Sequence, residues 1–513
     1  MTYPIALTIF CAAFALVTLA GFWAGRWRRP ATGMHSLEEW GLAGRSFGTL
    51  ITWFLIGGDL YTAYTIIAVP AAMYGAGAMG FFAIPYCILL YPYMMVTLPR
   101  LWTICTRNGY VTFADFVKGR FGLRPLTLAV AITGILSLMP YIALQLVGMR
   151  VVLEALGLKG NWPLTVAFLI LAAYTYSSGL RAPAIIAVVK DVMLYIMVLA
   201  AVIILPWKLG GFAHIFQVAR ATLPTHTPPG SILLKPGQML PYITLALGSS
   251  VALLLYPHTA TGMLSAKSAN TIKRNAALLP AYSIVLALLA VLGYVAIAAG
   301  VTGPDKNAVI PQLFLHGFPE WFAGFCLSAV AIGALVPAAI MSIAASNLFT
   351  RNVWGEFKRV RGTDLQESNM AKAVSLLVKF GALIFVLDDK SGYAIDMQLL
   401  GGIWIAQLFP SVMLGAFVRK LHPWALFCGW AAGMASGTAM AATLHLKSSV
   451  YPVHLFGHTY GTYAAIPALL LNLIVSFVLT PIFSAMKLRD RSNTAVAFAE
   501  VSDANIETRV PAH

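Results

Sequence analysis

The chain has 513 residues, of which 59% are hydrophobic and only 10% are charged, and its mean hydropathy is +0.80. Soluble domains carry about 25% charged residues, so this composition excludes a soluble multidomain protein and indicates a polytopic membrane protein. The net charge of +16 is concentrated in the loops between apolar runs, where anionic lipid headgroups explain it without a nucleic-acid partner. The five cysteines show no metal-ligand spacing, which predicts neither a disulfide framework nor a transition-metal site.

A membrane-spanning helix needs about 20 apolar residues. Runs of about this length predict thirteen spans, at 4–25, 49–77, 79–99, 126–154, 161–179, 183–207, 238–262, 276–300, 322–350, 372–388, 393–418, 424–446 and 461–486. No basic segment precedes the first run, so it is predicted to be a span rather than a cleaved signal peptide.

Lys and Arg residues divide unevenly between the two sides of this arrangement. One set of alternate loops, together with the C-terminal tail, holds 24 of them, and the other set holds 8. Because positive residues are enriched in cytoplasmic loops, we expect a multi-pass protein of the cell (inner) membrane with its N-terminus outside and its C-terminus in the cytoplasm. The polar tail from about residue 492 is predicted to be disordered.

The second run breaks the rule that spans avoid polar groups. Gly57, Gly58 and Asp59 lie inside it, and Pro70 follows. A glycine pair permits unwinding, and freed backbone carbonyls can coordinate a cation when they line a cavity. The alternative is a close helix contact made possible by the glycines, with an interfacial aspartate.

The seventh run repeats this feature. Gly248, Ser249 and Ser250 lie in its middle, and Tyr256-Pro257-His258 lies near its end. We expect an interruption there, with free N–H groups around residues 248–250. Two interrupted helices separated by four spans are typical of an inverted-repeat transporter whose binding site lies near the midplane.

Three further features stand out within apolar runs. Lys190 and Asp191 are adjacent in the sixth run, Lys379 lies in the tenth, and residues 338–346 form a stripe of small residues. Intramembrane charges are costly and indicate function, but a pair near the cytoplasmic end can also snorkel to the membrane surface, and we expect Lys379 to do so. The stripe is typical of close helix packing.

Four motifs, in order along the chain, then carry a resemblance. They are LAGRSFG at 42–48, GYVTFADF with GRFG at 109–122, Pro257-His258 with Ala266-Lys267-Ser268, and Ala339-Ile340-Met341-Ser342. The chain resembles the solute:sodium symporter family over about residues 39–486. The resemblance implies an all-α fold of about 13 transmembrane helices containing a five-plus-five inverted repeat, as in LeuT-like transporters.

The resemblance also implies the organisation of the chain. The expected parts are a first helix and loop (1–48), a first repeat (49–207), an external loop (208–237), a second repeat (238–418), two further helices (419–486) and a short tail (487–513). Residues 57–65, 256–259 and 274–280 resemble the monocarboxylate branch, which carries pyruvate, lactate, acetate and similar anions and, in some members, amino acids such as alanine.

The family's common sodium site transfers onto this chain as follows. The ligands would be the carbonyls of Gly57, Leu60 and Ala339 and the hydroxyl of Ser342, supported by Asp191. Asp59 matches a carboxylate that sodium-dependent members need.

Two positions depart from the family pattern. The second family hydroxyl falls on Ile343, which offers no oxygen ligand, and Asp191 lies about one turn farther along its helix than is typical. In some proton-coupled transporters of similar fold a lysine replaces sodium, which makes Lys190 a second coupling candidate. The coupling ion, Na+ or H+, therefore stays open, and no other cofactor is expected.

The substrate is expected to meet hydroxyls and partial positive charge. Candidate residues are Tyr61, Thr62, Tyr64, Gly248, Ser249, Ser250, His258 and Gln407, the last beside Trp404. Helix N-termini attract anions, and a histidine can donate a hydrogen bond or hold a proton; the alternative for His258 is a structural role beside Pro257.

These features predict a secondary active transporter that moves a small monocarboxylate with a cation by alternating access. Its partners would be the solute, sodium or a proton, and membrane lipid. Alternatives are symport of another solute (alanine, proline or pantothenate) and a membrane sensor built on a transporter fold. An enzyme is not expected, because the sequence shows no metal-ligand cluster or nucleophile motif.

Overall fold

The computed structural model describes residues 3–27, 34–58, 60–303, 305–358, 362–388, 394–455 and 457–498. The first half contains α1 (Pro4–Ala24), α2 (Leu37–Leu42), η1 (Ala43–Arg45), α3 (Thr49–Gly58), η2 (Tyr64–Ala68), α4 (Val69–Ala76), η3 (Ala78–Phe82), α5 (Ala83–Arg107), α6 (Phe113–Phe121), α7 (Arg124–Ala155), α8 (Trp162–Ser178), α9 (Arg181–Lys208), α10 (Gly211–Thr222) and η4 (Leu223–Thr225). The second half contains α11 (Pro236–Leu255), α12 (Pro257–Leu264), α13 (Ala269–Leu278), α14 (Pro280–Ala298), η5 (Lys306–Ala308), α15 (Val309–Gly317), α16 (Glu320–Leu348), η6 (Phe349–Trp354), α17 (Gly355–Phe357), α18 (Asp364–Asp388), α19 (Ala394–Ile405), η7 (Ala406–Leu408), η8 (Pro410–Leu414), α20 (Gly415–Phe417), α21 (Pro423–Thr443), β1 (Val450–Leu455), β2 (His458–Tyr463), α22 (Ala465–Ala485) and α23 (Ala495–Phe498).

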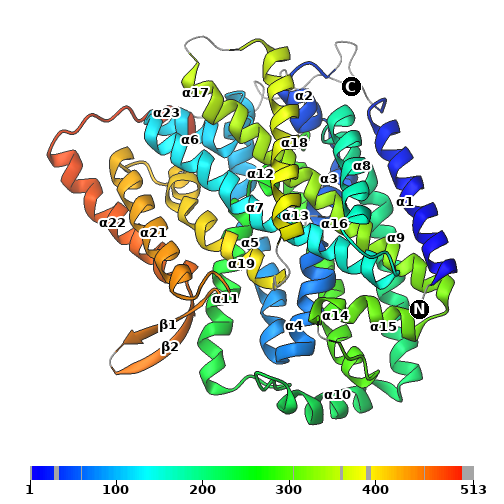
Figure 1. The fold of residues 1–513 in the computed structure, drawn as a ribbon. Coiled ribbons are helices and arrows are strands. Elements are labelled where there is room, and N and C mark those ends of the chain that lie inside the picture. Colours follow the sequence, from blue (N-terminus) through cyan, green and yellow to red (C-terminus); the bar gives the residue numbers. More distant parts are fainter. Residues whose placement is uncertain are drawn as a thin grey trace.

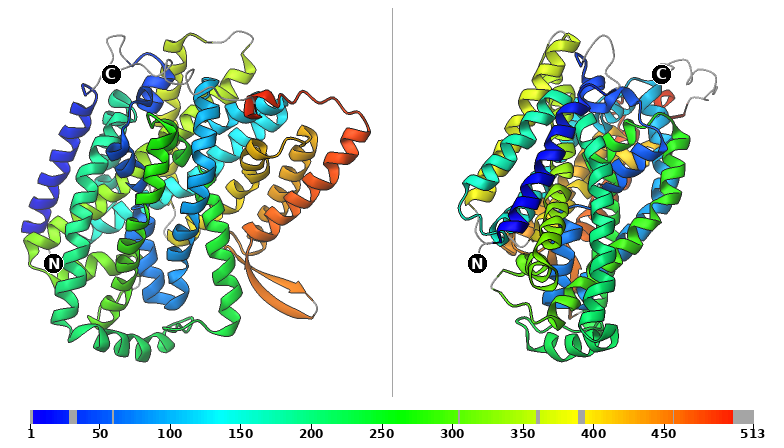
Figure 2. Two further views of the ribbon diagram at one scale, coloured as in Figure 1. Left: turned by 180° about the vertical axis from the view of Figure 1, so that it is seen from behind. Right: turned by 90° about the vertical axis from the view of Figure 1, so that its right-hand side faces the viewer.

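The long helices run side by side as a bundle (Figures 1 and 2). Within the described residues, eleven helices are long and apolar enough to cross a membrane. Two of the thirteen predicted spans are not among them: one is the split segment α3, η2 and α4, and the other is α8, with 17 residues. The start of α1 and the short helix α23 lie at opposite ends of the bundle (Figure 1).

One helix forms the centre of the bundle. Every residue of α16 from Cys326 to Leu348 is buried, and α16 packs against α1, α7, α9 and α18. The stripe of small residues predicted for close packing lies in this helix, because Ala, Gly and Ser side chains let several helices approach a common axis.

The two interrupted segments lie antiparallel and are tied together at both ends. At one end, Phe47, just before α3, pairs with Ala266, just after α12, while at the other end Gly77, just after α4, pairs with Ser231, before α11. Backbone hydrogen bonds accompany both pairings, including Phe47 N–H to Ser265 O at 3.1 Å. Segments far apart in sequence thus lie side by side and are paired at both ends.

Local sequence explains where several short helices begin. Ser36, Thr112 and Ser268 each accept a hydrogen bond from the N–H three residues later, at the starts of α2, α6 and α13. These side chains satisfy donors that a helix start leaves unpaired. Between α8 and α9, Gly179 has φ +56° and lies against the Trp40 carbonyl, where a Cβ would clash.

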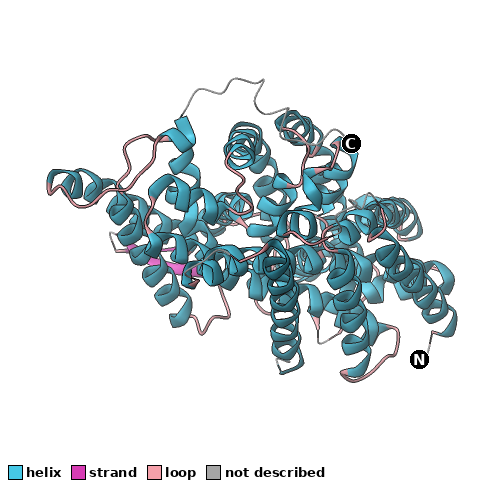
Figure 3. Cartoon of the chain, turned by 90° about the horizontal axis from the view of Figure 1, so that it is seen from above, coloured by secondary structure: helices cyan, strands magenta, loops and turns pink. Residues whose placement is uncertain are grey.

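A β-hairpin and an ordered tail segment depart from the sequence expectations. Strands β1 and β2 pair antiparallel, with Val450 opposite Tyr463, and they lie toward one edge of the bundle (Figure 3). The prediction of disorder from residue 492 is wrong for residues 492–498: Asn493 N–H donates to Arg120 O at 2.8 Å, and the Phe498 ring lies within cation–π distance of the guanidinium groups of three arginines, Arg100, Arg120 and Arg419. A single aromatic anchor surrounded by cations holds this segment in place.

Candidate functional site

The first break follows Gly58, as the glycine pair predicted. Helix α3 ends there, and a helix resumes only with the π-helical turn η2 at Tyr64. The N–H groups of Leu60 and Tyr61 both donate to the Gly57 carbonyl, at 2.9 and 3.2 Å. The Gly57 carbonyl therefore already accepts two hydrogen bonds, whereas the carbonyls of Gly58 and Tyr61 face Lys190 of α9. Asp59, the predicted coupling carboxylate, lies outside the described residues.

Lys190 of α9 reaches these two carbonyls. Its Nζ donates to Gly58 O at 2.8 Å and to Tyr61 O at 3.0 Å, and it lies 3.1 Å from Asp191 Oδ1. Both side chains are fully buried, which contradicts the snorkelling alternative. An ammonium in such a place is tolerated only when acceptors surround it. A cation that belongs to the protein therefore lies beside the break, on the carbonyls of Gly58 and Tyr61 rather than on those of the predicted ligands Gly57 and Leu60.

Asp191 links this group to a third helix. Its Oδ2 accepts a hydrogen bond from the Tyr282 hydroxyl of α14 at 2.6 Å. The Tyr61 hydroxyl in turn donates to the Tyr282 carbonyl at 3.1 Å, and the rings of Tyr61 and Tyr282 lie 4.5 Å apart. Gly57 packs directly on the Tyr282 ring, where a Cβ would overlap it. The predicted pair of adjacent charges therefore has different outer partners, carbonyls for Lys190 and a tyrosine for Asp191.

The other half of the predicted cation site lies on α16 and has separate partners. The Ser342 hydroxyl donates to the Ala339 carbonyl at 2.8 Å and accepts a hydrogen bond from Ser375 of α18 at 3.3 Å. Lys379 donates to Ser375 at 2.9 Å. The expectation that Lys379 snorkels is wrong, because its side chain is only 1% exposed. Its partner Ser375 lies one helical turn earlier on the same face of α18.

Side chains accept hydrogen bonds from the N–H groups at the start of the helix after the break. The N–H of Ala63 donates to Gln145 Oε1 of α7 at 2.9 Å, and the N–H of Tyr64 donates to the Thr62 hydroxyl at 3.0 Å. Thr65 accepts from the N–H of Thr62 at 2.9 Å. The Thr62 hydroxyl, predicted to face substrate, thus accepts a backbone hydrogen bond within the break. Gln145 was not predicted as a site residue. It is a lone amide in the middle of the fourth apolar run, and polar residues inside such runs indicate function elsewhere in the chain.

The second break lies later than predicted. Residues Gly248, Ser249 and Ser250 lie within the uninterrupted helix α11, and the helix is interrupted only at Tyr256, with φ −57° and ψ 138°. Pro257 explains this position, because a proline pushes the preceding residue into an extended conformation. Gly248 instead allows close packing on the Tyr463 ring, so the expectation of free N–H groups at 248–250 was wrong.

His258 follows this break and is fully buried. Its ring lies 5.2 Å from that of Tyr256 and 5.5 Å from that of Tyr141, and neither ring nitrogen has a hydrogen-bond partner among the described residues. The same holds for the Tyr64 hydroxyl and the Ser249 hydroxyl. Buried polar atoms of this kind require an explanation, and those of Tyr64, Ser249 and His258 belong to the two interrupted segments.

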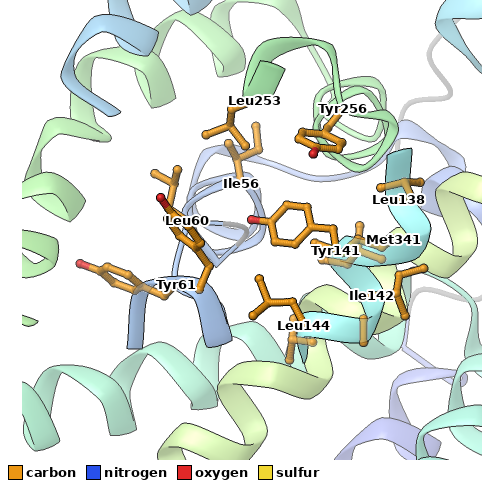
Figure 4. Packing of buried hydrophobic residues seen from close by; sticks show 14 of the residues in the cluster. Ile56, Leu60, Tyr61, Leu138, Tyr141, Ile142, Leu144, Leu253, Tyr256 and Met341 are labelled. Carbon is orange, nitrogen blue, oxygen red and sulfur yellow. The ribbon is translucent and has the colours of Figure 1, made fainter. Parts of the chain in front are cut away.

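An aromatic ring separates the two breaks. Tyr141 of α7 lies between Leu60 at the first break and Tyr256 at the second, with Met341 of α16 beside it (Figure 4). Apolar side chains from α3, α7, α11 and α16 surround it. The centre of the molecule thus combines an apolar wall with few polar atoms, as small-molecule sites in proteins do.

Gln407 makes contacts with a C-terminal helix that the sequence did not predict. Its backbone carbonyl and its Oε1 both accept from Asn472 of α22, at 2.9 and 3.2 Å, and Gly433 of α21 packs on the same side chain. Trp404 donates to Thr438 of α21 at 3.1 Å. Both residues connect α19 and η7 to the C-terminal helices α21 and α22.

A small pocket borders the second break on the side of α6. It is lined by residues of α6, α7, α12 and α16, including Thr112, Gly134, Pro257 and Ala344, and its volume is about 20 Å³. That is room for about one water molecule.

Comparisons with known proteins agree with this architecture. A sequence profile described as the sodium:solute symporter family matches residues 40–433. The chain is 49% identical to a monocarboxylate transport permease protein of Rhizobium johnstonii, covering 94% of this chain and 97% of that protein, and 30% identical to an uncharacterized symporter, YodF, of Bacillus subtilis, covering 93% of each. A solved Na+-coupled sialic acid symporter superposes with a TM-score of 0.76 at 14% identity, covering 95% of this chain and 99% of that one, so it shares the fold. The chain is therefore a multi-pass membrane protein that belongs to the sodium:solute symporter family.

Proposed function

We propose that this chain moves a small monocarboxylate, such as pyruvate, lactate or acetate, across the cell membrane together with protons. Its N-terminus would lie outside and its C-terminus in the cytoplasm. The relative at 49% identity named for monocarboxylate transport supports the substrate class. The single observation that carries the proton is the contact of Lys190 Nζ with Gly58 O and Tyr61 O.

The covalent attachment of the Lys190 ammonium favours a proton as the transported cation. A sodium ion bound at the break would leave with the substrate, but an ammonium group on a side chain cannot leave. Only its proton can cross the membrane. A lysine is suited to this role because its amine can release a proton inside a protein, whereas a guanidinium does not.

The proposed cycle uses the contacts at the first break. In the state described here, Lys190 is held by two carbonyls and by Asp191. When the segment after the break moves to open the cytoplasmic side, the ammonium loses the Tyr61 carbonyl and gives its proton to water there. The freed carbonyls favour the return of a protonated lysine, which takes its proton from water on the outside.

The substrate would lie between the breaks, beside Tyr141. A carboxylate needs donors in a dry site, and the hydroxyls of Tyr64 and Ser249 and a ring N–H of His258 are free to donate. The methyl or keto end of pyruvate would pack on the apolar wall formed by Leu60, Tyr141 and neighbouring residues. Tyr61, whose hydroxyl is already bonded to the Tyr282 carbonyl, would support the site rather than bind the anion.

The test is uptake of radiolabelled pyruvate into proteoliposomes of the purified protein. An inward proton gradient without sodium should drive accumulation, and an inward sodium gradient at equal pH should not. Accumulation that requires sodium would overturn the proton assignment. Uptake of pyruvate under neither gradient, with competition only by alanine, proline or pantothenate, would overturn the substrate class, and binding without any transport would identify a sensor.

A further inference from the structure

A second buried lysine lies on α18, another helix that packs against α16. Lys379 of α18 donates to Ser375 at 2.9 Å, Ser375 donates to Ser342 at 3.3 Å, and Ser342 donates to the Ala339 carbonyl at 2.8 Å. Helix α16 packs against both α9, which carries Lys190, and α18, which carries Lys379. A buried lysine therefore lies near each of the two groups of predicted cation-site residues, Lys190 at the first break and Lys379 beside α16.

The surroundings of the two lysines differ in charge. Lys190 has a carboxylate at 3.1 Å and two carbonyls, whereas Lys379 is absent from the ion pairs of the described residues and its ammonium donates to one hydroxyl. A buried ammonium with a single neutral acceptor is costly. If Lys379 gains and loses its proton during the cycle, its amino group can be neutral in the state described here and avoid that cost.

Several charged and titratable groups on α18 and on the helices packed against it have other partners, while the buried Tyr174 hydroxyl of α8 has none among the described residues. On α18 itself, Glu367 pairs with Arg351 of η6, and Lys372 lies over the Tyr176 ring of α8. On α7, Arg150 donates to Val386 O, and Tyr141 packs on Tyr256 and His258. On α2, Glu38 and Glu39 pair with Arg45 and Arg181, and on α16, Glu320 accepts from the N–H of Ile5. The groups linked to Lys379 are the hydroxyls of Ser375 and Ser342.

We propose that Lys379 is a second proton-carrying residue of the transport cycle, connected to α16 through Ser375 and Ser342. This inference rests on the proposed function. In the inward-facing state the Lys379 ammonium gives its proton to cytoplasmic water and leaves a neutral amine, and in the outward-facing state the amine takes a proton from external water. The hydroxyls of Ser375 and Ser342 reorient with each change, which links the protonation of Lys379 to the position of α16.

The consequence is a change in the charge moved in each cycle. One monocarboxylate with one proton carries no net charge, whereas one monocarboxylate with two protons carries one positive charge. Two carriers therefore make transport respond to the membrane potential. At equilibrium, each 100 mV acting on one charge changes the accumulation ratio about fiftyfold.

The experiment measures pyruvate accumulation in sodium-free proteoliposomes under an inward proton gradient, with and without a potassium diffusion potential. The wild-type protein should accumulate more pyruvate when the inside is negative. Lys379→Met should still respond to the proton gradient and lose the response to potential. Lys372→Met, on the same helix but beside Tyr176, is the matched control and should behave as wild type.

Lys379→Arg keeps a positive charge and a donor for Ser375 but cannot release a proton. It should transport without a response to potential, whereas a merely structural role of Lys379 would let arginine restore that response. If Lys379→Met does not fold, Lys379→Arg still tests the proposal. Wild-type uptake that follows the proton gradient but ignores potential would overturn this inference alone, and wild-type uptake that ignores the proton gradient would overturn the proposed function as well.

Discussion

At the scale of single residues, the two glycines before the first break have different tasks. Gly57 allows the Tyr282 ring to lie directly on the backbone, while a Cβ on Gly58 would lie 3.0 Å from Lys190 Nζ. One glycine therefore serves packing between α3 and α14, and the other serves the approach of an ammonium to the open carbonyls.

This difference predicts opposite outcomes for two alanine variants. Gly57→Ala must displace a buried ring and should lower stability by about 1–3 kcal/mol, seen as a lower melting temperature in detergent. Gly58→Ala meets the end of a flexible side chain, so it should fold normally and reduce proton-driven uptake about tenfold. Gly303→Ala, in open space, is the control, and normal uptake by Gly58→Ala would show that the Lys190 contact is not needed.

Lys190 also shows what sequence can and cannot predict about a site. The cost of an intramembrane charge singles out Lys190 and Asp191, and the glycine pair locates the carbonyls, so the first break was predicted correctly. The sequence does not say which carbonyls are free. That depends on the N–H groups of Leu60 and Tyr61, which use the Gly57 carbonyl and leave those of Gly58 and Tyr61.

At the scale of elements, the second break shows how composition can mislead. Small polar residues at 248–250 resemble an interruption, yet they lie in the continuous helix α11, where Gly248 accommodates the Tyr463 ring. The actual interruption comes from Pro257, whose effect on Tyr256 is local and could have been predicted from the sequence. Partners such as Tyr463, more than two hundred residues away, could not.

Gln145 provides an element-level test of the first break. Its Oε1 accepts from the N–H of Ala63, which begins the helix after the break. Replacing it with methionine leaves that buried N–H without a partner, at a cost of about 1–3 kcal/mol, so we expect a lower melting temperature and slower uptake. Gln145→Glu retains an acceptor oxygen and should be less affected; equal behaviour of the two variants would contradict a role in closing the helix start.

At the scale of the whole molecule, the described fold places two antiparallel interrupted segments around the buried helix α16. Apolar run lengths predicted most of the helices, since a bilayer imposes a minimum length on each. The docked residues 492–498 were missed because their partners lie far away in sequence, as the contacts of Phe498 with Arg100, Arg120 and Arg419 show. The β-hairpin, whose two strands are adjacent in sequence, lies largely in the loop between the last two predicted runs and was not predicted.

In the proposed cycle, Lys190 supplies the cation of the first break and carries the transported proton. The most direct measurement is proton-driven accumulation of radiolabelled pyruvate by Lys190→Met, with Lys208→Met, at the exposed end of the same helix and bonded to Gly317 O, as control. Accumulation above the equilibrium level should disappear in Lys190→Met and persist in Lys208→Met. Proton-driven accumulation by Lys190→Met at the wild-type level would contradict the account.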